Sequence, residues 1–181
     1  MIFDKASAVF KDEEFLRLDG FVDGINVVAK LENFNLAGSI KHKAANAMIA
    51  QYEQEGRIHK DSHVIESSSG NLGVALSMVC AEKGYKFTCV TDPNISPTNL
   101  SLMKAFGANV IQVEHIQNGG FVGERLKIID RLLTEDINAI WVDQYSNPAN
   151  IEAHYRLTGE AILKNIPEID YLFAGVGSSG T

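Results

Sequence analysis

The sequence has few cysteines, no block of basic residues and no long apolar run, and each absence argues against a class of protein. Its two cysteines, Cys80 and Cys89, lie in apolar runs, which indicates buried thiols in a reducing compartment rather than a disulfide framework. The net charge of −7, without clustered Lys or Arg, argues against nucleic acid as the main partner. No run approaches the roughly 20 apolar residues of a membrane helix, and Asp4 and Lys5 interrupt any signal peptide. We therefore expect a cytoplasmic protein with no membrane partner.

The composition is that of a folded chain. Of the 181 residues, 45% are hydrophobic and 22% are charged, which is too apolar for a disordered segment and enough to bury a sizeable core. The length suits one ordinary domain or two small ones. No internal repeat or low-complexity tract is present.

Short β-branched runs alternate with helical segments along most of the chain. The expected strands are residues 27–31, 63–66, 87–91, 109–113, 139–142 and 171–174. The expected helices are residues 41–55, 72–83, 97–106, 121–133 and 151–165. Because strand–helix–strand units at this spacing form right-handed crossovers, the alternation predicts an α/β fold with parallel sheets and helices on both faces.

Ligands of such folds bind beyond the carboxyl ends of the strands, so the strand-to-helix turns are the places to search. In the first of three unusual turns, residues 33–41, Gly38 and Ser39 open a helix and Lys41 stands one turn inside it. This pattern fits either a capped helix with a surface lysine or an amine held near a cofactor carbonyl, ready to form a Schiff base.

The second turn, residues 66–73, follows a strand directly and contains Ser67, Ser68, Ser69, Gly70 and Asn71. Backbone N–H groups and hydroxyls that converge at a helix start form a site for an anion such as a carboxylate. The alternative is ordinary N-capping, which needs only one such residue.

The third turn, residues 175–181, is made of small residues that let the backbone approach a phosphate closely, and its hydroxyls add hydrogen bonds. Its glycines also satisfy G-x-G-x-x-G, but a dinucleotide fingerprint expects an opening βαβ unit and an acidic residue ~20 positions further on. Together the three turns supply an amine, a carboxylate cradle and a phosphate cradle. A cofactor that would use all three is pyridoxal 5'-phosphate.

Four ordered motifs resemble those of the fold-type II pyridoxal-phosphate enzymes, the cysteine synthase family with its tryptophan synthase β-like fold. The family's lysine motif N-P-x-G-S-x-K-D-R is matched by residues 35–43, and its substrate loop T-S-G-N-T-G by residues 68–73. Its Q-F-x-N-P-A-N-x-x-A-H-Y stretch is matched by residues 144–155, and its phosphate loop G-T-G-G-T by residues 177–181. The resemblance covers about residues 27–181.

The resemblance implies a role for each matched position. Lys41 would bind the cofactor through its amine and then act as general base and acid, and Asn71 would also hydrogen-bond the cofactor ring hydroxyl. The residues implied to bind the substrate carboxylate are Ser68, Ser69, Gly70, Asn71, Leu72 (by its N–H) and Gln144. Those implied to hold the cofactor phosphate are Gly177, Ser178, Ser179, Gly180 and Thr181.

The sequence departs from the family pattern at several positions, such as His42 and Lys43 in place of D-R. The departures resemble a branch of the family whose enzymes join O-phospho-L-serine to the α-amine of L-glutamate by β-replacement. This reaction belongs to 2,3-diaminopropionate biosynthesis in siderophore and antibiotic pathways. The cations available for a phosphate leaving group are His42, Lys43, Arg125 and Arg156. Two alternatives stay open: a cysteine synthase that uses O-acetylserine or O-phosphoserine with sulfide, and a non-catalytic homologue.

The resemblance also implies a domain organisation. Residues 1–35 would hold N-terminal strands of the larger domain, residues 36–145 the smaller α/β domain, and residues 146–181 the start of the larger, cofactor-binding domain. Because the phosphate loop stops at Thr181, we expect a fragment of a longer enzyme, which in this family is a homodimer acting on small amino acids. No metal site is expected, since His63 and Glu66 point to opposite faces of their strand.

Overall fold

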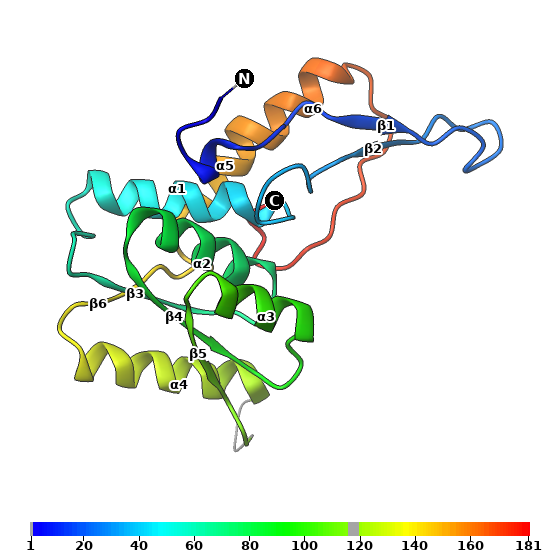
Figure 1. The fold of residues 1–181 in the computed structure, drawn as a ribbon. Helices are drawn as coiled ribbons and strands as arrows, with labels where there is room; N and C mark the ends of the chain where they lie inside the picture. Colours follow the sequence, from blue (N-terminus) through cyan, green and yellow to red (C-terminus); the bar gives the residue numbers. More distant parts are fainter. Residues whose placement is uncertain (1, 116–119) are drawn as a thin grey trace.

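A four-stranded parallel sheet lies at the centre of the computed structural model, which describes residues 2–115 and 120–181 (Figure 1). Its strand order is β5-β4-β3-β6. The strands are β3 (His63–Ser67), β4 (Lys86–Thr91), β5 (Asn109–Gln112) and β6 (Ala139–Trp141). The chain therefore adds β4 and β5 on one side of β3 and then crosses back to place β6 on the other.

Helices cover both faces of this sheet, as predicted (Figure 1). On one face lie α1 (Lys41–Gln54), α2 (Asn71–Lys83) and α3 (Pro97–Ala105), and on the other lies α4 (Gly120–Glu135). Residues 72–80 of α2 are all buried, because α2 packs against α1, α3 and the sheet. Gly73 permits the close approach to β4, since a Cβ at this position would lie 2.9 Å from Cys89 Sγ.

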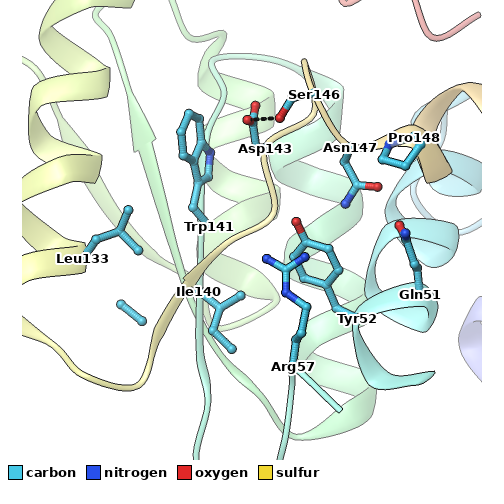
Figure 2. A pocket seen from close by; sticks show the side chains of 11 residues that line it. Gln51, Tyr52, Arg57, Leu133, Ile140, Trp141, Asp143, Ser146, Asn147 and Pro148 are labelled. Atoms are coloured by element: carbon cyan, nitrogen blue, oxygen red, sulfur yellow. Dashed lines mark hydrogen bonds between the residues drawn. The ribbon is translucent and has the colours of Figure 1, made fainter. Parts of the chain in front are cut away.

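The edge of β6 borders a cavity of about 690 Å³ (Figure 2). In this cavity the guanidinium of Arg57 stacks on the ring of Tyr52, with its carbon 3.7 Å from the ring centroid. The other polar side chains lining it include Asp143 and Asn147, from the turn that follows β6. None of the residues predicted to bind cofactor or substrate lines this cavity.

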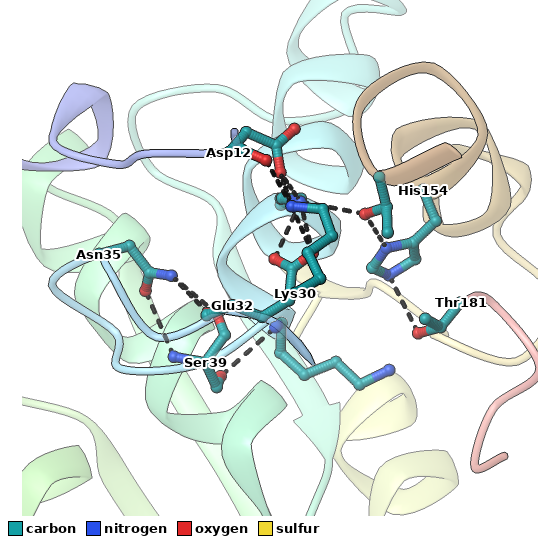
Figure 3. Close-up of polar contacts among 10 residues, drawn as sticks. Asp12, Lys30, Glu32, Asn35, Ser39, His154 and Thr181 are labelled. Carbon is teal, nitrogen blue, oxygen red and sulfur yellow. Dashed lines mark hydrogen bonds and ion pairs between the residues drawn. The ribbon is translucent and has the colours of Figure 1, made fainter. Parts of the chain in front are cut away.

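An antiparallel pair, β1 (Phe15–Arg17) and β2 (Val28–Lys30), projects from the rest of the chain (Figure 1). A cluster of charges, in which Lys43 is buried and the other members are partly buried, ties its flanks to α1: the amine of Lys43 pairs with Asp12 and, at 2.9 Å, with Glu32 (Figure 3). Lys30 pairs with the same two carboxylates at 2.8 and 3.1 Å. Two cations thus face two carboxylates, which is the condition under which buried charges are tolerated.

The last helical region confirms the predicted helix in outline, although it begins earlier and is not uniform. It runs through α5 (Pro148–Ala153), a π-helical stretch (His154–Gly159) and α6 (Glu160–Asn165). The helix starts at Pro148 because the side chain of Asn147 accepts a hydrogen bond from the Ala149 N–H, an N-cap that the apolar pattern did not reveal. π-helical turns are rare and frequently occur at functional sites.

The strand predicted at residues 171–174 is wrong. The segment is irregular and exposed, with Phe173 92% exposed, and within the described residues no strand lies beside it to complete a ladder. The other predicted strands and helices are confirmed with small shifts at their ends. Lys41 is the first residue of α1 rather than one turn inside it, because Gly38, Ser39 and Ile40 form a turn before the helix. Among the described residues, no helix is long and apolar enough to span a bilayer.

Replacing Lys43 by Met is expected to lower the free energy of unfolding by about 3 kcal/mol, because Asp12 and Glu32 would share only one cation in a buried site. The matched control is Lys164→Met, which removes the partner of Glu13 on the exposed surface and should cost under about 1 kcal/mol. Urea unfolding followed by circular dichroism measures both. Equal losses would contradict the buried cluster.

Candidate active site

The serine-rich turn lies between the end of β3 and the start of α2. The hydroxyl oxygen of Ser68 accepts hydrogen bonds from the N–H groups of Gly70 and Gly73, both at 3.2 Å, so this side chain shapes the turn. The N–H groups of Asn71 and Leu72 open α2 and have no acceptor within the described residues. Free N–H groups at a helix start attract an anion.

Gln144 lies beside this turn, as the resemblance implied. Its side-chain Nε2 donates to the carbonyl oxygen of Ser67 at 3.1 Å. Its own carbonyl oxygen accepts from Nδ2 of Asn150 at 2.8 Å, and the same Nδ2 donates to the hydroxyl of Ser178 at 3.1 Å. Asn150 therefore joins the Gln144 turn to the glycine–serine loop at residues 177–181.

The glycine–serine loop packs closely on Asn150. A Cβ at Gly180 would overlap the side-chain amide of Asn150, so only glycine permits this approach. Ser179 adopts a left-handed backbone with φ +62°, and Gly177 faces open space. The hydroxyl of Thr181 lies 3.5 Å from Nε2 of His154, on the π-helical stretch.

Lys41 begins α1, and its N–H donates to the Ser39 hydroxyl at 3.3 Å. No described residue forms a hydrogen bond or ion pair with its amine, and burial lowers the pKa of this amine. Burial, with the charges of Lys41 and Lys43, lowers the pKa of His154 to about 4, so the imidazole is neutral at pH 7. Thr181 of the glycine–serine loop contacts His154, and the loop lies on the side of the molecule where α1 begins with Lys41 (Figure 1). In Figure 1 the chain end lies beside the start of α1.

A chain of polar contacts connects the buried charge cluster to the glycine–serine loop (Figure 3). Lys43 donates to the hydroxyl of Thr158 at 3.0 Å, and this hydroxyl lies 3.2 Å from Nδ1 of His154. His154 thus bridges Thr158 and Thr181 through its two ring nitrogens. The imidazole is held by contacts on both sides.

Three of the four cations considered as partners for a phosphate leaving group make their contacts away from the serine-rich turn. His42 is buried against the carbonyl of Ser7 at 2.8 Å, Lys43 belongs to the charge cluster, and Arg156 pairs with Glu152 on the surface. Arg125 is the exception.

The buried Arg125 lies next to the serine-rich turn. It donates to the hydroxyl of Ser69 at 3.2 Å and pairs with Asp92 at 3.0 Å. Its Nε is buried and has no partner among the described residues. Of the cations considered, only Arg125 thus contacts a predicted substrate residue.

Two residues of the site were not assigned from sequence. Asn150 belongs to the N-P-A-N motif, but only the structure reveals that it links Gln144 to Ser178. Glu66 is a fully buried carboxylate that accepts the N–H of Gln144 at 3.2 Å. The sequence did contain a signal for Glu66: it is an acidic residue at the end of an otherwise apolar strand, next to the serine-rich turn.

The parallel sheet with helices on both faces defines an α/β protein, and the turns that follow β3 and β6 meet the glycine–serine loop at one candidate ligand site. The pattern of the family described as "Pyridoxal-phosphate dependent enzyme" matches residues 11–181, and the chain belongs to this family. It is 45% identical over 167 residues to the N-(2-amino-2-carboxyethyl)-L-glutamate synthase of Cupriavidus metallidurans, covering 91% of this chain and 49% of that protein. The synthase of the same name from Ralstonia nicotianae is 43% identical over 157 residues, 86% of this chain and 46% of that protein. The chain spans about half the length of these curated relatives.

Solved structures confirm the predicted fold-type II architecture. A hydrogen sulfide-producing enzyme from Fusobacterium nucleatum superposes with a TM-score of 0.83 and 31% identity, covering 92% of this chain and 54% of that one. An O-ureido-L-serine synthase superposes with a TM-score of 0.88 and 27% identity, covering 99% of this chain and 57% of that one.

The described residues fit pyridoxal 5'-phosphate. The Lys41 amine is desolvated and has no partner within the described residues, as a Schiff-base lysine requires. The close packing of Gly180 on Asn150 and the hydroxyls of Ser178 and Thr181 suit a phosphate group. The individual roles of Lys41, Asn71 and residues 177–181 stay predictions.

Replacing Gly180 by Ala is expected to weaken binding of pyridoxal phosphate roughly tenfold, or about 1.4 kcal/mol, because the added Cβ must displace Asn150 and the loop. The control is Gly175→Ala, where a Cβ meets nothing within 4 Å. Cofactor titration followed by absorbance compares the variants with the wild type. Equal affinities in the Gly180 and Gly175 variants would show that the loop does not hold the cofactor.

Proposed function

We propose that the chain is the lysine-bearing part of a synthase that joins an activated serine, O-phospho-L-serine, to the α-amine of L-glutamate. The product would be N-(2-amino-2-carboxyethyl)-L-glutamate. The observation that carries the proposal is the 45% identity over 91% of the chain to a synthase of that name. The arrangement of Lys41, the start of α2 and the glycine–serine loop supports it.

In such a β-replacement, different residues of the chain would bind the substrate and move its proton. When bound, pyridoxal phosphate supplies an electron sink for a carbanion at the substrate Cα. The N–H groups of Asn71 and Leu72, with Gln144, would hold the substrate carboxylate and so orient its Cα–H bond. Lys41 would remove the Cα proton and later return it, and burial favours this because it lowers the pKa of the amine toward neutrality.

Arg125 would assist departure of the phosphate group. It is the one candidate cation in contact with the serine-rich turn, and its buried Nε has no partner within the described part of the chain. Asp92 balances its charge while the protein is free of ligand. A guanidinium donates readily to phosphate oxygens, so Arg125 favours a phosphorylated donor over an acetylated one.

Sulfide is the second candidate nucleophile. The observation behind it is the 31% identity to an enzyme described as hydrogen sulfide-producing, in which sulfide is the product, so sulfide as the incoming group would be the reverse step. A homodimer, a place in 2,3-diaminopropionate biosynthesis and a cytoplasmic location belong to the same proposal.

Substituting Lys41 by Ala is expected to abolish both the visible absorbance of the cofactor–lysine imine and its bleaching by borohydride, with a loss of activity of about 1000-fold or more. The control is Lys60→Ala, which replaces an exposed lysine that is not among the predicted site residues and should keep the absorbance. Spectra and turnover are measured on the same preparations. Retention of a borohydride-sensitive band in the Lys41 variant would place the imine on another residue.

Incubation with O-phospho-L-serine and L-glutamate is expected to give the aminocarboxyethyl-glutamate product, whereas sulfide in place of glutamate gives cysteine much more slowly. Mass spectrometry of both mixtures, with O-acetyl-L-serine as the alternative donor, identifies the pair that reacts. Preferential formation of cysteine would favour the second candidate. Borohydride-sensitive cofactor binding without either product would indicate a non-catalytic homologue.

A further inference from the structure

Glu66 is a fully buried carboxylate that the proposed chemistry does not use. Its Oε1 accepts hydrogen bonds from the Ser67 N–H at 2.7 Å and from the indole N–H of Trp141 at 3.2 Å. Its Oε2 accepts from the Gln144 N–H at 3.2 Å. A buried charge is costly unless it is well hydrogen-bonded, so three donors aimed at one side chain point to a defined role.

The three donors come from segments that border the candidate site. Ser67 opens the serine-rich turn, Trp141 ends β6, and Gln144 is the predicted carboxylate-binding side chain. A further bond, from Gln144 Nε2 to the Ser67 carbonyl at 3.1 Å, closes a ring through Glu66, Gln144 and Ser67. The backbone and the side chain of Gln144 are therefore both fixed relative to the turn.

The backbone between Trp141 and Gln144 needs such a restraint. Asp143 has a positive φ of 50°, a conformation that is uncommon for residues other than glycine, although aspartate adopts it more often than most, and its carboxylate accepts the Tyr145 N–H at 3.2 Å. The Glu66 carboxylate, bound to Trp141 on one side of Asp143 and to Gln144 on the other, provides this restraint.

We propose that Glu66 is a positioning residue that holds Gln144 and the serine-rich turn together as one carboxylate-binding unit, and that protonation of Glu66 loosens the unit. The inference rests on the proposed function, in which this unit binds the donor's carboxylate. Glu66 acts through Gln144 and Ser67 and does not itself contact the substrate.

The charge of Glu66 changes near neutral pH. Burial raises its pKa to about 7, the three N–H donors lower it, and the charge of Asp143 on the turn after β6 raises it. Cys89 is the register partner of Glu66 on β4, and the charge of Glu66 raises the pKa of this thiol while the charge of Arg125 on α4 lowers it. Hydrogen bonds to an ionised acceptor are roughly twice as strong as neutral ones. Affinity for the donor amino acid should therefore be full above pH ~7 and fall as the pH drops below it.

Trp141 provides a direct readout, because it is the single tryptophan of the chain and its indole donates to Glu66. Emission of the purified protein is recorded across neutral pH without substrate. The expected result is a one-proton transition near pH 7 in the wild type, absent in Glu66→Gln and retained in the control Glu82→Gln, whose carboxylate binds Ser7 instead. A wild-type protein without this transition overturns the proposal, even if the Glu66 variant does not fold.

The second measurement is the affinity for O-phospho-L-serine as a function of pH. In Glu66→Gln, an amide NH₂ replaces one acceptor oxygen and faces an N–H donor, so the Kd should rise about tenfold above neutral pH and lose its pH dependence. The Glu82 control should bind as the wild type does. An unchanged Kd, or a fall in kcat alone, would refute the positioning role. Wild-type binding with this pH dependence but without product would refute the proposed function and leave this inference intact.

Discussion

The hydrogen bonds of two side-chain amides, Gln144 and Asn150, are the constraint on which the site depends. The serine-rich turn, the turn after β6 and the glycine–serine loop lie far apart in the sequence and share no helix or strand. Gln144 binds the first of them, and Asn150 binds both Gln144 and Ser178. An amide side chain carries donors and an acceptor together, so it can join backbone and hydroxyl groups from several segments at once. Without these bonds the predicted carboxylate and phosphate sites would be separate features of one surface.

The environment of the site shifts its ionisable groups in opposite directions. Burial lowers the pKa of Lys41 and raises that of Glu66 to about 7, so both move toward neutral pH. The physical cause is the same for both groups: desolvation penalises the charged form, which is the protonated amine of Lys41 and the deprotonated carboxylate of Glu66. The two groups differ in their partners: Glu66 has three donors, while the amine of Lys41 has none among the described residues. This difference fits the proposed roles, in which Lys41 would have to reach the substrate as a base and Glu66 would have to be held in place.

The departures from the family's lysine motif have a structural explanation in this chain. Lys43, which stands where the family motif has arginine, is buried in a cluster with Asp12, Lys30 and Glu32. The cluster anchors the N-terminal segment to α1, and Thr158 and His154 continue it to Thr181. Lys43, which the sequence presented as a candidate leaving-group cation, is thus part of the framework. Only Arg125 keeps a contact with the serine-rich turn.

The α/β class, most of the helices and strands, and the family could be predicted from the sequence, because these depend on local periodicity, on capping residues and on short motifs. Residues 171–174 show the limit: the apolar run predicts a strand, but a strand also needs a neighbour, and the described chain supplies none. Which side chains are in contact became known only from the three-dimensional structure. That Asn150 reaches Ser178, that Arg125 rather than Lys43 lies by the serines, and that Glu66 collects three N–H donors follow from how separate segments pack. Such contacts join residues far apart along the chain, and no local pattern encodes them.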